Sequence, residues 1–327
     1  MAYINVDEVY ILDNTGLQVD MATDIPFVDA GFTDAQKEQA RKNIAAGGSN
    51  RNLLDNWYFV GGGSQLGDGV FPINQRGQAS YSGYGNHFDR WRGETNYPSI
   101  TLAADGVKFC STTSGQWGTM VQALAKECVI AGKTVTASAI IDGTLASTTY
   151  SIPSSGGYDL TPATVGDIAF NLYSPNGTDI QFRFYTTTAT AHTITAAKLE
   201  FGTVSTLAND APPDFGEELR KCQRRLFIHD FANGEVIANG FAVSASYSVF
   251  SLTLPVSMAS DGTLTGTITA NPLIYGGGTG EQTSSFSVSA VKGNYATIGV
   301  ATTVMPSNNA VTLYANTNIR LTISKEL

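Results

Sequence analysis

The chain has 327 residues, which is long enough for two domains that each bury a hydrophobic core. Charged residues make up 14% of the sequence, well below the roughly 25% of an average soluble protein, and the formal net charge is −9. This acidic balance argues against nucleic acid as a partner, because a phosphate-binding face needs clustered basic residues. Membrane insertion is not expected either, since no apolar run approaches the length of about 20 residues that a spanning helix needs.

Residues 1–50 are predicted to form an N-terminal arm that ends in a short helix. Residues 1–31 show no strong hydrophobic period and lack the basic and apolar regions of a secretory signal, so we expect irregular chain without export by a signal peptide. A capping box at residues 33–36 (TDAQ) and the glycines Gly47 and Gly48 predict a helix over residues 33–46. Such a helix is too short to be stable alone, and its partner is either the same helix of other copies or the following domain.

Residues 51–210 contain short apolar segments that are separated by clusters of Gly, Pro, Asn and Ser. Three segments alternate so that one set of side chains points inward and the other outward, namely residues 134–141 (TVTASAII), 179–185 (DIQFRFY) and 191–201 (AHTITAAKLEF). Many closely spaced strands without a long helix between them predict an antiparallel jelly-roll β-sandwich. Trp57 and Phe59 lie in an apolar run and are expected in its core.

Residues 211–227 are predicted to link the two β-rich parts through a helix. Pro212 and Pro213 mark the boundary, and Asp214 is a good N-cap for a helix of about three turns over residues 214–227. Its apolar stripe consists of Leu219, Cys222 and Leu226, which we expect to pack between the two β-domains.

Residues 228–327 are predicted to form a second, C-terminal β-sandwich. Strands are expected at residues 249–256, 285–291, 296–304 and 310–323, and the glycine-rich residues 276–280 are expected to form a flexible loop. The abundance of Gly and aromatic residues agrees with β-structure, because aromatic side chains suit a pleated surface and Gly supplies turns. The expected fold class is therefore mainly all-β.

Three stretches carry a resemblance to a known class of proteins. The first is residues 33–47 (TDAQKEQARKNIAAG); the second combines residues 52–59 (NLLDNWYF), 72–77 (PINQRG) and 89–91 (DRW); the third is residues 198–225 (KLEFGTVSTLANDAPPDFGEELRKCQRR). They resemble segments of bacteriophage and prophage tail-fibre and receptor-binding proteins, in which a short helix precedes a carbohydrate-binding-module-like jelly roll.

The C-terminal residues resemble the terminal sandwich of such fibres more loosely. The resemblance lies in Gly240-Phe241 and in Leu254-Pro255-Val256. Residues 259–262 (ASDG) stand where those proteins usually have apolar residues and proline.

The resemblance implies a virion protein that is assembled in the host cytoplasm and recognises bacterial surface glycans as a homotrimer. Residues 1–50 would attach the chain to other particle proteins, and residues 228–327 would form the host-facing tip. Low charge also favours self-association, because exposed apolar area must be covered. The alternatives are a head fibre or a tail-like bacteriocin fibre, and, in another class, a polysaccharide-degrading enzyme or its binding module.

The sequence offers no motif for catalysis or for a cofactor. The three histidines, His87, His192 and His229, form no metal-binding pattern, and the pair His87 and Asp89 is interpreted as a polar pair in a loop. The three cysteines show no CxxC spacing and are expected as buried small residues, so no metal, cofactor or disulfide is predicted. We expect no enzymatic activity, while Asp68, Asp89 and Glu94 keep the hydrolase alternative open because carboxylate spacing is spatial.

Aromatic and polar side chains in loop-like settings are the candidates for glycan binding, because sugars stack their C–H faces on aromatic rings. Packing in the core is the alternative interpretation for each of them. The candidates in residues 51–210 are Tyr81, Tyr84, Trp91, Arg92, Tyr97 and Trp117, and those in residues 228–327 are Tyr247, Tyr275 and Tyr295.

Overall fold

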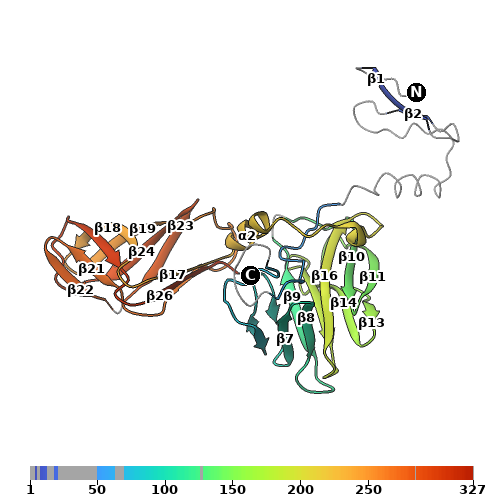
Figure 1. Ribbon diagram of the computed structural model, residues 1–327, viewed down its shortest axis with the longest axis horizontal. Coiled ribbons are helices and arrows are strands. Elements are labelled where there is room, and N and C mark those ends of the chain that lie inside the picture. The colour runs from blue at the N-terminus through green and yellow to red at the C-terminus, as the bar shows by residue number, and fades with distance from the viewer. Residues whose placement is uncertain are drawn as a thin grey trace. The chain divides into compact units, whose positions relative to one another are not determined.

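The computed structural model describes residues 4–5, 8–12, 18–20, 50–62, 70–125, 128–283 and 285–326. The chain divides into two compact units, Met1–Ser49 and Asn50–Leu327. The described strands form several antiparallel sheets, and helix is confined to two short segments in the described part of the second unit (Figure 1). The prediction of a mainly all-β protein is confirmed.

The first unit contains a three-stranded antiparallel sheet of β1 (Ile4–Asn5), β2 (Glu8–Leu12) and β3 (Gln18–Asp20). The prediction of irregular chain is therefore wrong for these segments. The register pairs Ile4 with Val9 and Ile11 with Val19, residues whose branched side chains favour extended backbone. The predicted helix at residues 33–46 lies outside the described residues.

Residues 50–210, which we call the middle module, form two sheets. The six-stranded sheet has the order β11 (Thr144–Ser151), β10 (Thr134–Ile141), β16 (His192–Phe201), β8 (Gly106–Ser111), β7 (Pro98–Ala103) and β4 (Ser80–Ser82). The seven-stranded sheet has the order β12 (Tyr158–Asp159), β14 (Ile168–Ser174), β15 (Gln181–Thr186), β9 (Gly118–Ala123), β6 (Arg92–Gly93) and β5 (Gly85–Asn86), with β13 (Ala163–Val165) paired to β14.

Both sheets of the middle module contribute to one hydrophobic core, so they pack face to face in a sandwich-like arrangement. The strands predicted at residues 134–141, 179–185 and 191–201 correspond to β10, β15 and β16. Alternation explains the burial along β15, since Phe182 and Phe184 are fully buried while Arg183 between them is not. Trp57 and Phe59 are buried in this core, as predicted.

A linking segment with η1 (Leu207–Asn209) and α2 (Phe215–Gln223) follows. The Asp214 side chain caps α2 by accepting a hydrogen bond from the Glu217 amide at 2.7 Å, as predicted. The helix is shorter than predicted, because Leu226 already belongs to strand β17. An apolar residue at this position fits both a helical stripe and a buried strand.

The predicted packing of the α2 stripe between the two β-domains is wrong for Leu219 and Cys222. Cys222 is fully buried in a small cluster with Phe71 and Ile73, and Leu219 packs against the same cluster. All of these partners precede the first strand of the middle module or belong to α2 itself. The apolar face of α2 thus packs against residues of the middle module.

Residues 226–326, which we call the C-terminal module, contain a second large core and two sheets. The small sheet has the order β17 (Leu226–Phe231), β26 (Ile319–Ser324) and β20 (Thr265–Ile268). The seven-stranded sheet has the order β22 (Thr279–Gln282), β21 (Leu273–Gly276), β25 (Ala310–Tyr314), β18 (Val236–Ser244), β19 (Tyr247–Thr253), β24 (Tyr295–Ala301) and β23 (Ser287–Lys292).

Two predictions for the C-terminal module are corrected. Residues 310–323 form two strands in different sheets, β25 and β26, instead of a single strand. Residues 276–280 are the tight hairpin between β21 and β22 instead of a flexible loop. Gly277 and Gly278 adopt φ values of 60° and 81°, which only glycine tolerates well, and they form a two-residue turn that matches the twist of the strands.

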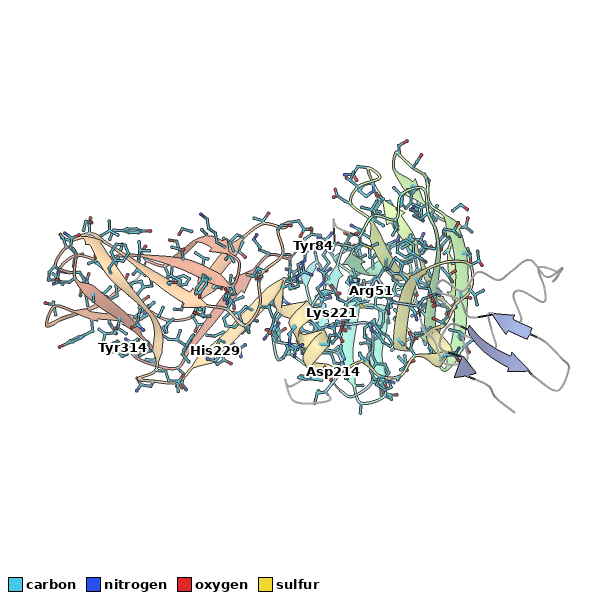
Figure 2. All side chains as sticks on the ribbon, turned by 90° about the horizontal axis from the view of Figure 1, so that it is seen from above. Arg51, Tyr84, Asp214, Lys221, His229 and Tyr314 are labelled. Atoms are coloured by element: carbon cyan, nitrogen blue, oxygen red, sulfur yellow. The ribbon has the colours of Figure 1, made fainter. Side chains whose placement is uncertain are left out.

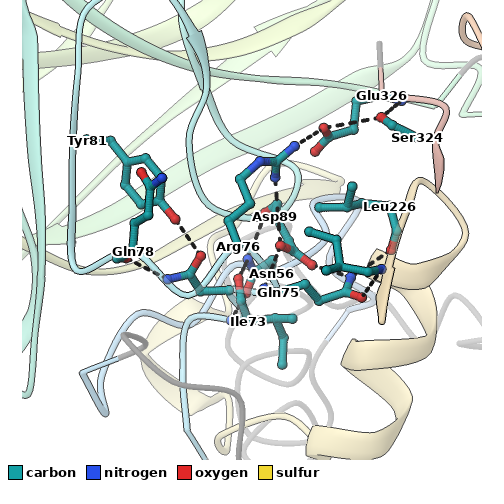
Figure 3. A network of polar contacts seen from close by, with 12 residues as sticks. Asn56, Ile73, Gln75, Arg76, Gln78, Tyr81, Asp89, Leu226, Ser324 and Glu326 are labelled. Atoms are coloured by element: carbon teal, nitrogen blue, oxygen red, sulfur yellow. Dashed lines mark hydrogen bonds and ion pairs between the residues drawn. The ribbon is translucent and has the colours of Figure 1, made fainter. Parts of the chain in front are cut away.

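Polar contacts join the two modules within the second unit (Figure 3). The Gln75 side chain donates to Asp89 at 2.6 Å and to the Leu226 carbonyl at 2.7 Å. Arg76 pairs with Glu326 near the C-terminal end. The structure therefore links a loop of the middle module to β17 and to the residues after β26, and the predicted division at residues 211–227 into separate domains stays a prediction.

The remaining sequence expectations concern cysteines and membranes. The three cysteines are free; Cys222 is buried as predicted, whereas Cys110 and Cys128 are only partly buried. Over the described part of the chain, the helices are too short or too polar to cross a bilayer.

Candidate functional site

The outer face of the seven-stranded sheet in the middle module carries a row of aromatic and cationic side chains. Along β15, Phe182 and Phe184 point into the core, so Arg183 and Tyr185 lie on the opposite face. The register places Asn171 of β14 opposite Arg183, and Tyr173 is two residues further along the same face. We call Trp117, Tyr173, Arg183 and Tyr185 the platform.

The four platform side chains follow one another in space. The Arg183 guanidinium carbon lies 4.8 Å from the ring centroids of both Tyr173 and Tyr185, which places the cation at favourable distances from two rings. The Trp117 ring centroid lies 5.3 Å from that of Tyr185, at an interplanar angle of 59°. Trp117 is 55% exposed, whereas the two tyrosines are partly buried. The resulting row of planar groups is Tyr173, Arg183, Tyr185 and Trp117.

Hydrogen bonds hold the centre of the platform in place. Arg183 donates through Nη2 to Asp159 at 2.7 Å and through Nε to the side-chain oxygen of Asn171 at 3.2 Å. Asn171 in turn donates to Asp159 at 2.7 Å and to the Leu160 carbonyl at 2.6 Å. Because these contacts fix the side chains before any ligand arrives, binding loses little side-chain entropy.

The electrostatics of the platform suit an uncharged polar ligand. Asp159 balances the charge of Arg183, and its side chain remains 57% exposed as a hydrogen-bond acceptor. Burial raises the pKa of Tyr185, so its hydroxyl stays protonated and available for hydrogen bonding at neutral pH. The platform can thus offer stacking surfaces together with both donors and acceptors.

Two of the predicted site residues lie on this sheet face. Trp117 directly precedes β9, and Arg92 of β6 is opposite Val121, which is itself opposite Arg183. Arg92 forms an ion pair with Glu94 at 2.6 Å, and Gln181 donates to the same carboxylate at 2.6 Å. Sequence reasoning missed Tyr173, Arg183 and Tyr185. The alternation in residues 179–185 was the signal that could have placed Arg183 and Tyr185 on the outer face.

Trp91 is a correction, because it belongs to the core and is not accessible to a sugar. It is 1% exposed, and its ring packs against Phe59, Phe182 and Phe184. Its indole nitrogen donates to the Asn56 carbonyl at 2.9 Å, which satisfies the polar group of a buried tryptophan.

The other candidates of the middle module lie elsewhere. Tyr84, which is labelled in Figure 2, is 73% exposed and lines a groove whose lining contains none of the platform residues. Tyr81 is buried, with its hydroxyl donating to Asn74, and Tyr97 is partly buried. The lining of the groove beside Tyr84 includes neither Tyr97 nor Trp117.

The candidates of the C-terminal module lie on the outer face of its seven-stranded sheet. Tyr247 is 38% exposed and Tyr275 is 50% exposed. A Cβ built on Gly299 would lie 2.0 Å from the Tyr247 hydroxyl, and one built on Gly280 would lie 3.4 Å from the Tyr275 ring. Each ring thus covers a glycine of a neighbouring strand and keeps another side open. Tyr295, at the same sheet, is 53% exposed.

The described residues contain no group of three or more His, Cys, Asp or Glu side chains that could hold a metal ion. His87 contacts the Gly83 carbonyl at 3.0 Å, whereas Asp89 accepts two hydrogen bonds from Gln75, so the two side chains serve different partners. Asp68 lies outside the described residues.

Three surfaces thus carry candidate residues: the platform, the groove beside Tyr84, and the tyrosine-bearing face of the C-terminal module. The platform has the most extensive set of mutually fixed side chains among them. No protein-family model, curated protein or solved structure matches this chain.

Proposed function

We propose that this protein is a non-enzymatic adhesin that binds bacterial surface glycans through the platform. The observation that carries the proposal is the continuous row of planar side chains on an exposed sheet face, whose central Arg183 is held by Asp159 and Asn171. Aromatic rings held in this way offer apolar faces to the C–H side of a sugar at low entropic cost.

The platform side chains have complementary tasks in this proposal. Trp117, the most exposed ring of the platform, stacks on one sugar ring, and Tyr185 extends the stacking surface. Asp159 accepts hydrogen bonds from sugar hydroxyls, while N–H groups of Arg183 other than those bonded to Asp159 and Asn171 donate to ring or hydroxyl oxygens. A single site of this kind binds weakly, so several copies must act together to hold a cell.

The resemblance to phage fibres supports the rest of the proposal. In this proposal the chain is a homotrimeric tail-fibre or receptor-binding subunit of the virion, assembled in the host cytoplasm. Residues 51–210 form a carbohydrate-binding-module-like jelly roll, and residues 228–327 form a C-terminal sandwich at the host-facing tip. Three copies multiply weak sugar contacts, with gains in avidity of about 10² to 10⁴.

Binding of the whole protein to an array of purified bacterial surface polysaccharides tests the proposed function. We expect Trp117→Ala to weaken binding about tenfold or more, because it removes the exposed stacking ring. Val129→Ala is the matched control, since Val129 is 67% exposed in the same module and lies outside the platform. Equal binding by both variants would reject the platform, and release of reducing ends from a bound polysaccharide would favour the enzyme alternative.

A further inference from the structure

A second groove of the middle module has a composition different from that of the platform. It encloses about 590 Å³ beside strands β4 and β7, in the size range of small-molecule sites. Its lining consists of Gln78, Ser80, Tyr81, Ser82, Tyr84, Asn86, His87, Ser99 and Thr101. None of these residues is an acid, a lysine or an arginine.

The floor of the groove is a patch of hydroxyl groups. The register pairs Ser80 with Thr101 and Ser82 with Ser99, so these side chains share one face of the β4–β7 pair. Tyr81 and Ile100 between them are buried, which confirms that the hydroxyl-bearing residues point outward. Serine and threonine hydroxyls both donate and accept hydrogen bonds, as sugar hydroxyls do.

Tyr84 forms an exposed wall of the groove, and its backbone position is tightly specified. It lies between Gly83 and Gly85, whose φ values of 74° and 127° disfavour other residues. Gly93 approaches this turn so closely that an added Cβ would lie 2.2 Å from the Gly83 carbonyl oxygen. The chain therefore holds a 73% exposed tyrosine at a defined place beside the hydroxyl patch.

His87 contributes an uncharged ring to the lining. Its Nε2 contacts the Gly83 carbonyl at 3.0 Å, and because a carbonyl only accepts, Nε2 carries the proton. Burial lowers the pKa of His87 to about 4, so the ring is uncharged at neutral pH. Its Nδ1 has no hydrogen-bond partner within the described part of the structure.

We propose that this groove is a second saccharide site, which takes one or two residues of an uncharged, hydroxyl-rich sugar. Tyr84 supplies the stacking ring, and the hydroxyls of β4 and β7 together with Asn86 and Gln78 supply hydrogen bonds. Acidic sugars are disfavoured because the lining offers no cation to a carboxylate. The inference does not require the platform to bind glycan.

The test is titration of the whole protein with neutral gluco- and galacto-oligosaccharides, compared with matched uronic-acid oligosaccharides, by calorimetry and saturation-transfer NMR. We expect millimolar or tighter binding of at least one neutral sugar, with Tyr84→Ala weakening it tenfold or more. Thr101→Val, which keeps the shape of an exposed side chain but removes its hydroxyl, should weaken binding severalfold. Val129→Ala, which changes an exposed residue outside both the groove and the platform, serves as the control and should leave this binding unchanged.

Each other outcome contradicts the inference. The groove is not a site if neutral sugars bind Tyr84→Ala and Thr101→Val as tightly as they bind the parent protein. It is also rejected if no sugar of the panel binds at millimolar concentration. Uronic-acid oligosaccharides that bind as tightly as neutral ones would overturn its selectivity. Loss of all binding in Trp117→Ala, with Tyr84→Ala intact, would assign the sugar to the platform and leave the proposed function standing without this groove.

Discussion

At the scale of single residues, Arg183 is the centre of the platform. Its planar guanidinium group lies near two tyrosine rings and still forms hydrogen bonds in the plane to Asp159 and Asn171. A lysine ammonium carries the same charge but can neither stack as a plane nor fork between two acceptors. The side chain thus orders its neighbours by its shape as well as by its charge.

Replacement of Arg183 by lysine separates these two properties. We expect Arg183→Lys to weaken glycan binding about tenfold, which corresponds to about 1.4 kcal/mol, while the fold is retained. Calorimetric titration with a polysaccharide that binds the parent protein measures this. Arg320→Lys is the matched control, because Arg320 forms a similar pair with Asp230 in the C-terminal module. Unchanged affinity in Arg183→Lys would mean that the planar group has no part in binding.

Asp89 couples folding to pH. Burial raises its pKa from 3.8 to about 7, although hydrogen bonds from Gln75 and the nearby Arg76 favour the ionised form. The unfolded chain therefore loses this proton first, and the Asp89 contribution lowers stability as pH rises from about 4 to 7, on the order of 4 kcal/mol. The His87 contribution to stability changes with pH in the opposite direction. Its pKa in the folded protein is about 4, so the unfolded chain takes up the proton first and stability falls as pH drops below 6.5.

These opposite contributions can be separated by mutation. We expect the stability of Asp89→Asn relative to that of the parent protein to increase as pH rises from 4 to 6.5, because of these two contributions only that of His87 remains. His87→Gln should show the reverse, with stability falling between pH 4 and 7. Urea unfolding at several pH values gives the free energies of unfolding. Parallel pH profiles for the three proteins would show that neither group is perturbed.

Burial could be predicted from the sequence for some aromatic residues but not for others. Trp57 and Phe59 were recognised as core residues because they lie in an apolar run. Trp91 and Arg92 could not be separated in this way, since β6 has only two residues and is too short for alternation to show which side chain points inward. The partners of Trp117 were missed because they come from strands distant in sequence, and only the register brings them together.

At the scale of elements, the strands with clear alternation were predictable and the turns were less so. The predicted strand at residues 134–141 has the bounds of β10, because Val135, Ala137 and Ala139 alternate with hydroxyl-bearing residues before the strand ends in two isoleucines. The glycines of residues 276–280 suggested flexibility, but positive φ angles at Gly277 and Gly278 make them a tight hairpin. The end of α2 was misplaced because Leu226 and Phe227 suit either a helix or the pairing of β17 with β26.

The hairpin between β21 and β22 gives a matched pair of variants. Alanine is strained at both glycines, at a cost of roughly 1–2 kcal/mol for the left-handed conformation. At Gly277 the new Cβ would also lie 2.8 Å from Asn309 and 3.0 Å from Pro306, whereas at Gly278 it would meet open space. We expect Gly277→Ala to destabilise the protein more than Gly278→Ala in denaturant unfolding. The reverse order, or no loss in either variant, would contradict the turn geometry.

At the scale of the whole molecule, the first unit and the second unit are separately compact. The second unit contains two large cores, which are connected by α2 and by the polar contacts of Gln75 and Arg76. These contacts depend on residues 150 or more positions apart, so composition and periodicity could not reveal them. The homotrimer is a further property of the whole molecule, and it stays a prediction.

Truncation tests the independence of the two units. We expect a protein of residues 50–327 to unfold at nearly the same temperature as the whole chain, because the core clusters found among the described residues are built from the second unit. The whole chain should have the native mass of a trimer in light scattering, and the truncated chain a reduced tendency to assemble. An insoluble or unfolded truncated protein would show that the first unit contributes to a core, and a monomeric whole chain would reject the trimer.

The central claim, that the platform binds glycan, can be followed by tryptophan fluorescence. Of the three tryptophans, Trp57 and Trp91 are 7% and 1% exposed, whereas Trp117 is 55% exposed, so quenching by acrylamide reports mainly on Trp117. The measurement is acrylamide quenching during titration with a polysaccharide whose binding is established by calorimetry. Saturable protection from quenching is the expected result, because a sugar ring stacked on Trp117 excludes the quencher. Binding by calorimetry with unchanged quenching would contradict the claim.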